Sequence, residues 1–276
     1  VSATLYVNSI EHIDKSLREK QLAQLENIKF KIISKNQKKR SEFYIDIGNQ
    51  FKFIANYDKA IEYDEKALAI RLKSLGENHP KVAIAYNNLG GGWMKKGDND
   101  KAIEYYEKGL AIILKAFEEN HPDTAVHYNN LGVAWSNKKA TEKAIEYYEK
   151  ALDINLKYFG ENHPDVATTY RNLGVACNEK GETEKVMEYY EKALAIYLKA
   201  LGKDHPDLAT AYNNLGVAWS EKGDNNKAIE YYEKAVAIRL KSFGENHPDL
   251  ALSYNKLGLA WSEKGDNNKA IEYYEK

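Results

Sequence analysis

Histidine and proline form the first pattern in this chain that suggests chemistry. The tripeptide His-Pro-Asp occurs four times, and its histidines follow one another at intervals of 42 residues: His121, His163, His205 and His247. A proline in the first turn of a helix lacks only an N–H that would have no partner, and an aspartate there complements the positive helix end. We therefore interpret each tripeptide as a helix start. The histidines lie a full repeat apart and no Cys or His pair has metal-ligand spacing, so no metal site is expected.

The single cysteine and a triple glycine also have structural interpretations. Cys177 stands where other repeats carry tryptophan, which predicts a buried slot, whereas a nucleophilic thiol needs a lowered pKa and solvent access. The run Gly90-Gly91-Gly92 falls inside an expected helix and lacks the following Gly-Lys-Ser/Thr of a phosphate loop. No nucleophile with a base, no paired carboxylates and no cofactor fingerprint stand apart from the repeat pattern. We therefore expect no enzyme activity and no cofactor.

All of these patterns belong to one repeat of 42 residues. The pentapeptide that starts at Tyr86 recurs with few changes at Tyr128, Tyr170, Tyr212 and Tyr254. Each repeat divides into a helix A that starts at His-Pro and a helix B that follows a Lys-Gly-Asp stop, as at Gly223-Asp224. There glycine can adopt the left-handed conformation and aspartate can cap the next helix. Helix B carries two apolar stripes at helical spacing, so it must be buried between neighbours, and the hairpins must stack.

These repeats resemble the tetratricopeptide repeat, most closely the 42-residue form of kinesin light chains. If Ala83 is counted as repeat position 1, then Leu89-Gly90 fill the family's positions 7 and 8. Position 32, usually a proline, is Leu72 and its equivalents here, so helix B is expected to run on. The resemblance covers residues 41–276. It implies an all-α solenoid, a right-handed superhelix of helix-turn-helix repeats.

The spacing predicts an N-terminal segment followed by an array of repeats. Residues 1–40 are predicted to contain a capping helix between Glu11 and Ser34. The array is predicted to hold about five and a half repeats, at 41–82, 83–124, 125–166, 167–208, 209–250 and the truncated 251–276. Asp64 replaces the tyrosine of other repeats, so the first repeat is the most divergent. Uncovered apolar residues near Leu257 and Trp261 predict end-to-end self-association.

The resemblance implies that the A helices line a concave groove and turn positions 2, 5, 6, 9, 12 and 13 toward an extended peptide. Asparagine recurs at positions 5 and 6, and its amide can both donate to and accept from any peptide backbone. Arg171 replaces asparagine in its repeat, and Lys95 stands at position 13, where later repeats carry Glu179, Glu221 and Glu263. The groove is therefore expected to be more basic toward its N-terminal half and more acidic toward its C-terminal half. The predicted peptide-binding residues are Asn87, Asn88, Lys95, Asn129, Asn130, Val133, Arg171, Asn172, Val175, Asn213, Asn214, Val217 and Asn255.

The charge balance narrows the class of partner. The chain has 40 Lys and Arg residues against 41 Asp and Glu, so it lacks the one-signed field that nucleic acids and anionic membranes attract. No apolar stretch approaches the ~18 residues of a transmembrane helix, and a single cysteine fits a reducing compartment. We expect a cytoplasmic, non-catalytic scaffold that binds a protein or peptide, and neither nucleic acid nor membrane.

Two other functions remain open from the sequence. The repeats would also suit the sensor or regulatory arm of a larger signalling enzyme whose NTPase or protease domain lies outside this segment. They would equally suit a self-assembling structural rod. The full open reading frame tests the first alternative, and light scattering against concentration tests the second.

Overall fold

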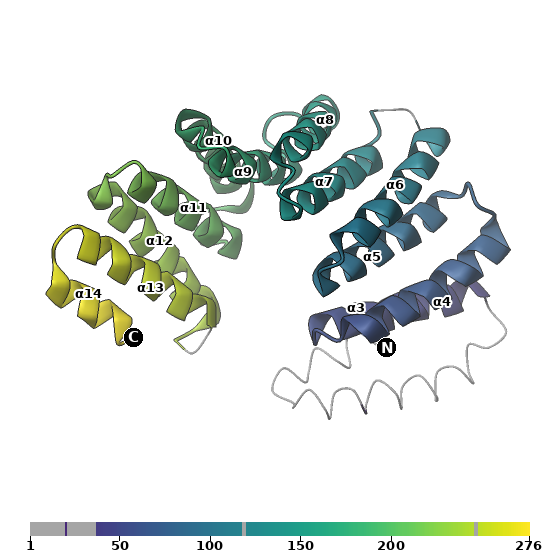
Figure 1. Ribbon diagram of the computed structural model, residues 1–276, viewed down its shortest axis with the longest axis horizontal. Coiled ribbons are helices and arrows are strands. Elements are labelled where there is room, and N and C mark those ends of the chain that lie inside the picture. Colours follow the sequence, from purple (N-terminus) through teal and green to yellow (C-terminus); the bar gives the residue numbers. More distant parts are fainter. Residues whose placement is uncertain (1–19, 21–36, 118–119, 246–247) are drawn as a thin grey trace. The chain divides into compact units, whose positions relative to one another are not determined.

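The computed structural model describes residues 20, 37–117, 120–245 and 248–276, and all regular secondary structure in these ranges is α-helical (Figure 1). The expected capping helix between Glu11 and Ser34 lies outside the described residues, apart from Lys20. The chain divides into two compact units, Val1–Lys139 and Ala140–Lys276, each of which is described by itself.

The first unit consists of antiparallel helix hairpins. Its A helices are α3 (Gln37–Phe53), α5 (Pro80–Lys96) and α7 (Pro122–Asn137), and its B helices are α4 (Tyr57–Leu75) and α6 (Asn99–Ala116). Each B helix packs against the A helix before it and the A helix after it, so the hairpins stack as the two apolar stripes predict (Figure 1).

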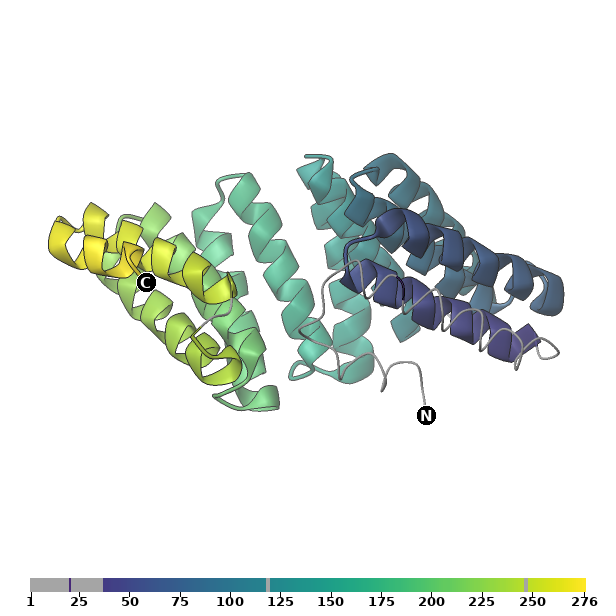
Figure 2. The ribbon, with the colours of Figure 1, turned by 90° about the horizontal axis from the view of Figure 1, so that it is seen from below.

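The second unit repeats the same alternation, and its neighbouring helices again run antiparallel (Figure 2). Its A helices are α9 (Pro164–Glu179), α11 (Pro206–Glu221) and α13 (Pro248–Glu263). Its B helices are α8 (Thr141–Phe159), α10 (Thr183–Leu201), α12 (Asn225–Phe243) and α14 (Asn267–Tyr274).

The helix starts confirm the interpretation of the His-Pro tripeptides and add a role for the imidazole. In α5, α7, α9 and α11 the histidine before the proline is the N-cap, and its Nδ1 accepts a hydrogen bond from the backbone N–H two residues on, at 3.1 to 3.3 Å. This satisfies one of the free N–H groups of the first turn. The stop between helices also forms as expected, because Gly223 has φ +85° and Asp224 accepts from the N–H of Lys227 at 3.1 Å.

The core is built from small and large residues at fixed repeat positions. The leucines at position 7 are at most 1% exposed: Leu89, Leu131, Leu173, Leu215 and Leu257. The tyrosine at position 24 lies beneath the glycine at position 8, and a Cβ on Gly90 would stand only 2.6 Å from the ring of Tyr106. Glycine is therefore required where the two helices of a hairpin approach each other.

The first repeat replaces this tyrosine by a buried ion pair. Asp64 stands opposite Gly48, and its Oδ2 lies 2.7 Å from Nζ of Lys52. The carboxylate side chain is fully buried, whereas the lysine side chain keeps 21% of its surface exposed. Burial raises the pKa of Asp64, and the nearby Lys52 ammonium and Arg71 guanidinium oppose that shift.

The last repeat corrects one expectation about exposed apolar residues. Leu257 and Trp261 are only 1% and 8% exposed, because they pack against Ala228, Ile229 and Tyr232 of α12. On α14 the exposed apolar residues are Ile271 and Tyr274, at 55% and 48%. Their equivalents Ile229 and Tyr232 in α12 are covered by α13, and α13 itself exposes Leu252 and Leu259, at 54% and 52%.

Candidate functional site

The predicted peptide-binding residues all lie on A helices, and most are partly exposed. Lys95, Val175 and Asn255 are exposed, and Asn213 is buried. The remaining members are half-buried: Asn87, Asn88, Asn129, Asn130, Val133, Arg171, Asn172, Asn214 and Val217. None of the position 6 asparagines is buried between helices, so this stripe of side chains is accessible to a ligand.

In the first unit two of these asparagines already bond to each other. The amide nitrogen of Asn130 in α7 donates to the amide oxygen of Asn87 in α5 at 2.7 Å. In addition, Lys52 of α3 donates to the backbone oxygen of Asn88 at 3.1 Å. The asparagine stripe therefore joins successive repeats as well as presenting amides at the surface.

In the second unit the arrangement differs because Arg171 occupies position 5 of α9. Its Nη2 donates to Oδ1 of the neighbouring Asn172 at 3.3 Å. The guanidinium also acts electrostatically on the buried phenols of Tyr148 and Tyr190, whose pKa values are raised chiefly by burial. Arg171 is thus half-buried, and its guanidinium is close enough to these two phenols to oppose the rise in their pKa values.

Three glutamates at position 13 form a row that the predicted set did not include. Glu179 accepts from the hydroxyl of Thr141 at 3.1 Å, and Glu221 accepts from the amide of Asn178 at 3.2 Å. Glu263 accepts from the hydroxyl of Ser220 at 3.0 Å. Each carboxylate is therefore fixed by a donor from the preceding repeat. Their recurrence at position 13 is visible in the sequence, where it predicts an acidic C-terminal half of the groove, although they were not counted among the peptide-binding residues.

A pocket of about 230 Å³ lies between α11 and α13. Its lining comprises Val217, Ser220, Glu221, Tyr232, Lys256, Leu259 and Ala260. Of the predicted residues only Val217 belongs to it, and Leu259, which is 52% exposed, supplies a second apolar wall. The pocket brings together side chains from two successive repeats, as a groove across the A helices requires.

Lys256 is one of the six pocket residues that the predicted set did not include, and it brings a positive charge to the pocket. It replaces asparagine at position 6, and that departure from the pattern was the available signal. Burial lowers the pKa of Lys256, the Arg239 guanidinium lowers it further, and the Glu221 carboxylate opposes both. The pocket therefore combines apolar walls with one cationic and one anionic group.

Residues that could suggest catalysis have structural roles here. Cys177 is 2% exposed, and burial raises the pKa of its thiol, so the thiolate needed for nucleophilic attack is disfavoured. Gly90-Gly91-Gly92 lies within α5. Among the described residues no three His, Cys, Asp or Glu side chains are placed to hold a metal ion. None of the described helices is both long and apolar enough to cross a membrane.

Comparisons with known proteins agree with this architecture. The family model of the tetratricopeptide repeat matches residues 44–91, 94–139, 137–199, 187–241 and 220–276. A comparison with curated protein sequences finds none that matches.

Three solved structures illustrate the likeness in fold. BtubC from P. vanneervenii is 25% identical, with a TM-score of 0.66 over 80% of this chain and 86% of its own. A kinesin light chain-like repeat protein of P. anserina is 26% identical, with a TM-score of 0.62 over 71% of this chain and 93% of its own. One chain of the APC/C hetero-tetramer Cut9–Hcn1 is 16% identical, with a TM-score of 0.65 over 92% of this chain and 41% of its own length. At this identity the likeness shows the fold alone.

Proposed function

Because this chain belongs to the tetratricopeptide repeat family, we propose that it is a non-catalytic scaffold whose A helices bind an extended segment of a partner protein. The family and the related structures support a protein-interaction role in general. The finer statement, that the partner segment lies across the A helices, rests on the chemistry of their exposed stripe.

The observation that carries this proposal is the pocket between α11 and α13. Its volume of about 230 Å³ is several times the ~30 Å³ share of one water molecule in the liquid. Val217 and Leu259 offer apolar contacts, and Tyr232 contributes an aromatic wall. One apolar side chain of the partner would anchor there, in the manner of a buried anchor residue at an interface.

Polar residues on the A helices, most of them outside the pocket, would hold the backbone of the bound segment. Asn172 and Asn214 at position 6 are half-buried and can donate and accept hydrogen bonds without demanding a sequence. The row Glu179, Glu221 and Glu263 is fixed in place by bonds from the preceding repeats. Preorganised groups of this kind lose little entropy when a ligand binds.

The test is binding to a library of random peptides by the wild-type chain and two variants. Leu259→Glu places a charge in the pocket, and Phe243→Glu places the same charge at the end of α12, where Phe243 is 45% exposed but outside the pocket. We expect Leu259→Glu to weaken the selected peptides at least about tenfold, or ~1.4 kcal/mol, and Phe243→Glu to leave them unchanged. Equal binding by both variants, or no peptide selected by the wild-type chain, would contradict the proposal.

A further inference from the structure

Repeat position 31 changes from each contact between repeats to the next one along the chain, although the residue before it does not. Position 30 is isoleucine throughout: Ile70, Ile112, Ile154, Ile196 and Ile238. Position 31 is Arg71, Ile113, Asn155, Tyr197 and Arg239. All five are at most 8% exposed. The repeats are nearly identical, yet the buried residue at position 31, where each repeat meets the next, is charged in two of them and apolar, an amide or aromatic in the other three.

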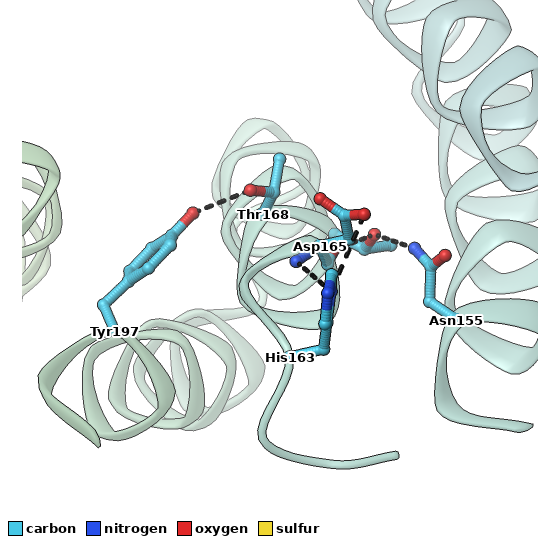
Figure 3. Close-up of polar contacts among 6 residues, drawn as sticks. Asn155, His163, Asp165, Thr168 and Tyr197 are labelled. Carbon is cyan, nitrogen blue, oxygen red and sulfur yellow. Dashed lines mark hydrogen bonds and ion pairs between the residues drawn. The ribbon is translucent and has the colours of Figure 1, made fainter. Parts of the chain in front are cut away.

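The residue opposite, at position 3 of the next A helix, varies as well. At the contact of α8 with α9, Asn155 donates to the hydroxyl of Thr169 at 3.2 Å, and Thr169 is fully buried. In Figure 3 α9 lies between Asn155 on one side and Tyr197 of α10 on the other. The hydroxyl of Tyr197 lies 2.9 Å from that of Thr168 on α9 (Figure 3). The next A helix then presents the small Ala211 at position 3.

The other contacts use different chemistry at the same place. Between α12 and α13, Arg239 donates to the hydroxyl of Ser253. Between α4 and α5, Arg71 donates to the backbone oxygen of Lys81 at 2.6 Å, and position 3 is alanine. Between α6 and α7, position 31 is Ile113 and position 3 is the buried His127.

We propose that the residue pairs at positions 31 and 3 keep these near-identical repeats in order, by penalising a B helix that docks on the wrong A helix of the same or another copy. Such wrong docking is possible in this chain, because residues 220–234 and 262–276 are identical. A wrong pairing would place Asn155 against Ala211, which leaves a buried amide without its partner, or Tyr197 against Thr169, which overfills the space. Both defects are costly in a close-packed contact, so the pairs discriminate against alternatives.

The first test exchanges one pair for another. Tyr197→Asn puts an amide opposite Ala211, and Tyr197→Asn with Ala211→Thr installs the Asn/Thr pair of α8 and α9 at this contact. The matched control is Tyr197→Asn with Ser253→Thr, which adds the same threonine at the wrong contact. The readout is hydrogen exchange of the amides in α10 and α11.

We expect Tyr197→Asn to increase local opening at least about tenfold, Ala211→Thr to reverse most of that increase, and Ser253→Thr to reverse none. If Tyr197→Asn unfolds the second unit, the same comparison is made on recovery of helical circular dichroism. Rescue by Ala211→Thr alone supports pair recognition. Equal effects of the two threonines, or no rescue, would overturn it.

The second test asks whether the pairs specify order as well as stability. The variant Tyr197→Asn, Ala211→Thr, Arg239→Asn, Ser253→Thr gives three successive contacts of the second unit the same Asn/Thr pair. After refolding from urea at rising protein concentration, light scattering should show a larger oligomeric fraction than for the wild-type chain. A variant that refolds with the same oligomeric fraction as the wild type would show that the pairs do not set the order.

Discussion

The imidazole of His127 fills the space that a side chain on Gly109 would need. A Cβ on Gly109 would lie 2.8 Å from Nε2 of His127 and 3.1 Å from the backbone oxygen of Ala83. The ring is 3% exposed, and its Nδ1 lies 2.8 Å from the backbone oxygen of Asp123. A buried titratable side chain thus joins α5, α6 and α7, and a glycine in the middle of α6 makes it possible.

Gly109→Ala should destabilise the first unit by about 1 to 2 kcal/mol. Overpacking costs roughly 1 to 3 kcal/mol, and the better helix propensity of alanine returns up to ~1 kcal/mol. The obstacle is the ring and not the backbone, because the equivalent residues Ala67, Ala151, Ala193 and Ala235 are accommodated. Urea unfolding measures the change. In the background His127→Ala the same Gly109→Ala should instead stabilise, and a loss of stability in both backgrounds would contradict this account.

The stability of the first unit should decrease as the pH falls, because His127 is buried. Burial lowers the pKa of His127 below its ordinary value of 6.5, while the carbonyl and carboxylate of Asp123 and the carbonyl of Ala83 oppose that shift. The unfolded chain therefore takes up the proton first. Stability is fully present above pH 6.5 and is lost as the pH falls from there toward the lower folded-state pKa. Thermal melts at pH 7.5 and 5.5 should differ more for the wild type than for His127→Thr, and equal differences would contradict the prediction.

The buried pair Lys52–Asp64 should be replaceable by the apolar pair of the second repeat. There Met94 and Tyr106 hold the equivalent positions, with Sδ and the phenolic oxygen 4.0 Å apart. Asp64→Tyr alone leaves a largely buried ammonium without its carboxylate, which should cost about 1 to 3 kcal/mol. Lys52→Met with Asp64→Tyr should be neutral or stabilising by up to ~4 kcal/mol, as for other buried ion pairs. Chemical denaturation of the wild type, the two single variants and the double variant gives the coupling free energy between positions 52 and 64. If the effects of the two single substitutions simply add, the prediction is contradicted.

The fold could be predicted largely because its signals are local. A proline after His205 and a glycine at Gly223 fix a helix start and stop within a few residues of themselves. The geometry of the candidate site, in contrast, depends on distances between side chains of different repeats, which are not local. The bond between Asn87 and Asn130 and the pocket beside Lys256 join residues about one repeat apart, and sequence spacing does not give side-chain direction. For the same reason, the sequence did not predict that Asn213 is buried while its equivalents are half-buried or exposed.

Self-association of this chain should depend on Ile271 and Tyr274. Both are about half exposed on α14, whereas their equivalents Ile229 and Tyr232 are 5% and 4% exposed beneath α13. Covering such apolar side chains is favourable by roughly 25 cal/mol per Å². Sedimentation of the 276-residue chain should therefore show concentration-dependent association that Ile271→Lys with Tyr274→Lys abolishes and Phe243→Lys does not. A strict monomer at high concentration would contradict the prediction.

Arg171 should select among bound peptides, while Asn172 should contribute to the affinity of all of them. The guanidinium prefers a carboxylate, which it can bind through two hydrogen bonds, whereas an amide bonds to any backbone. Arg171 is half-buried and bonded to Asn172 at 3.3 Å, so it is partly desolvated and oriented before a ligand arrives. Arg171→Glu should weaken an acidic peptide by about 1 to 3 kcal/mol and a neutral peptide less.

Asn172→Ala should weaken acidic and neutral peptides alike. Titration of a matched acidic and neutral peptide pair against both variants separates the two roles, and circular dichroism confirms that helicity is retained. If Arg171→Glu leaves the ranking of the peptides unchanged, selection does not occur at α9, and the half-buried guanidinium serves only to orient Asn172.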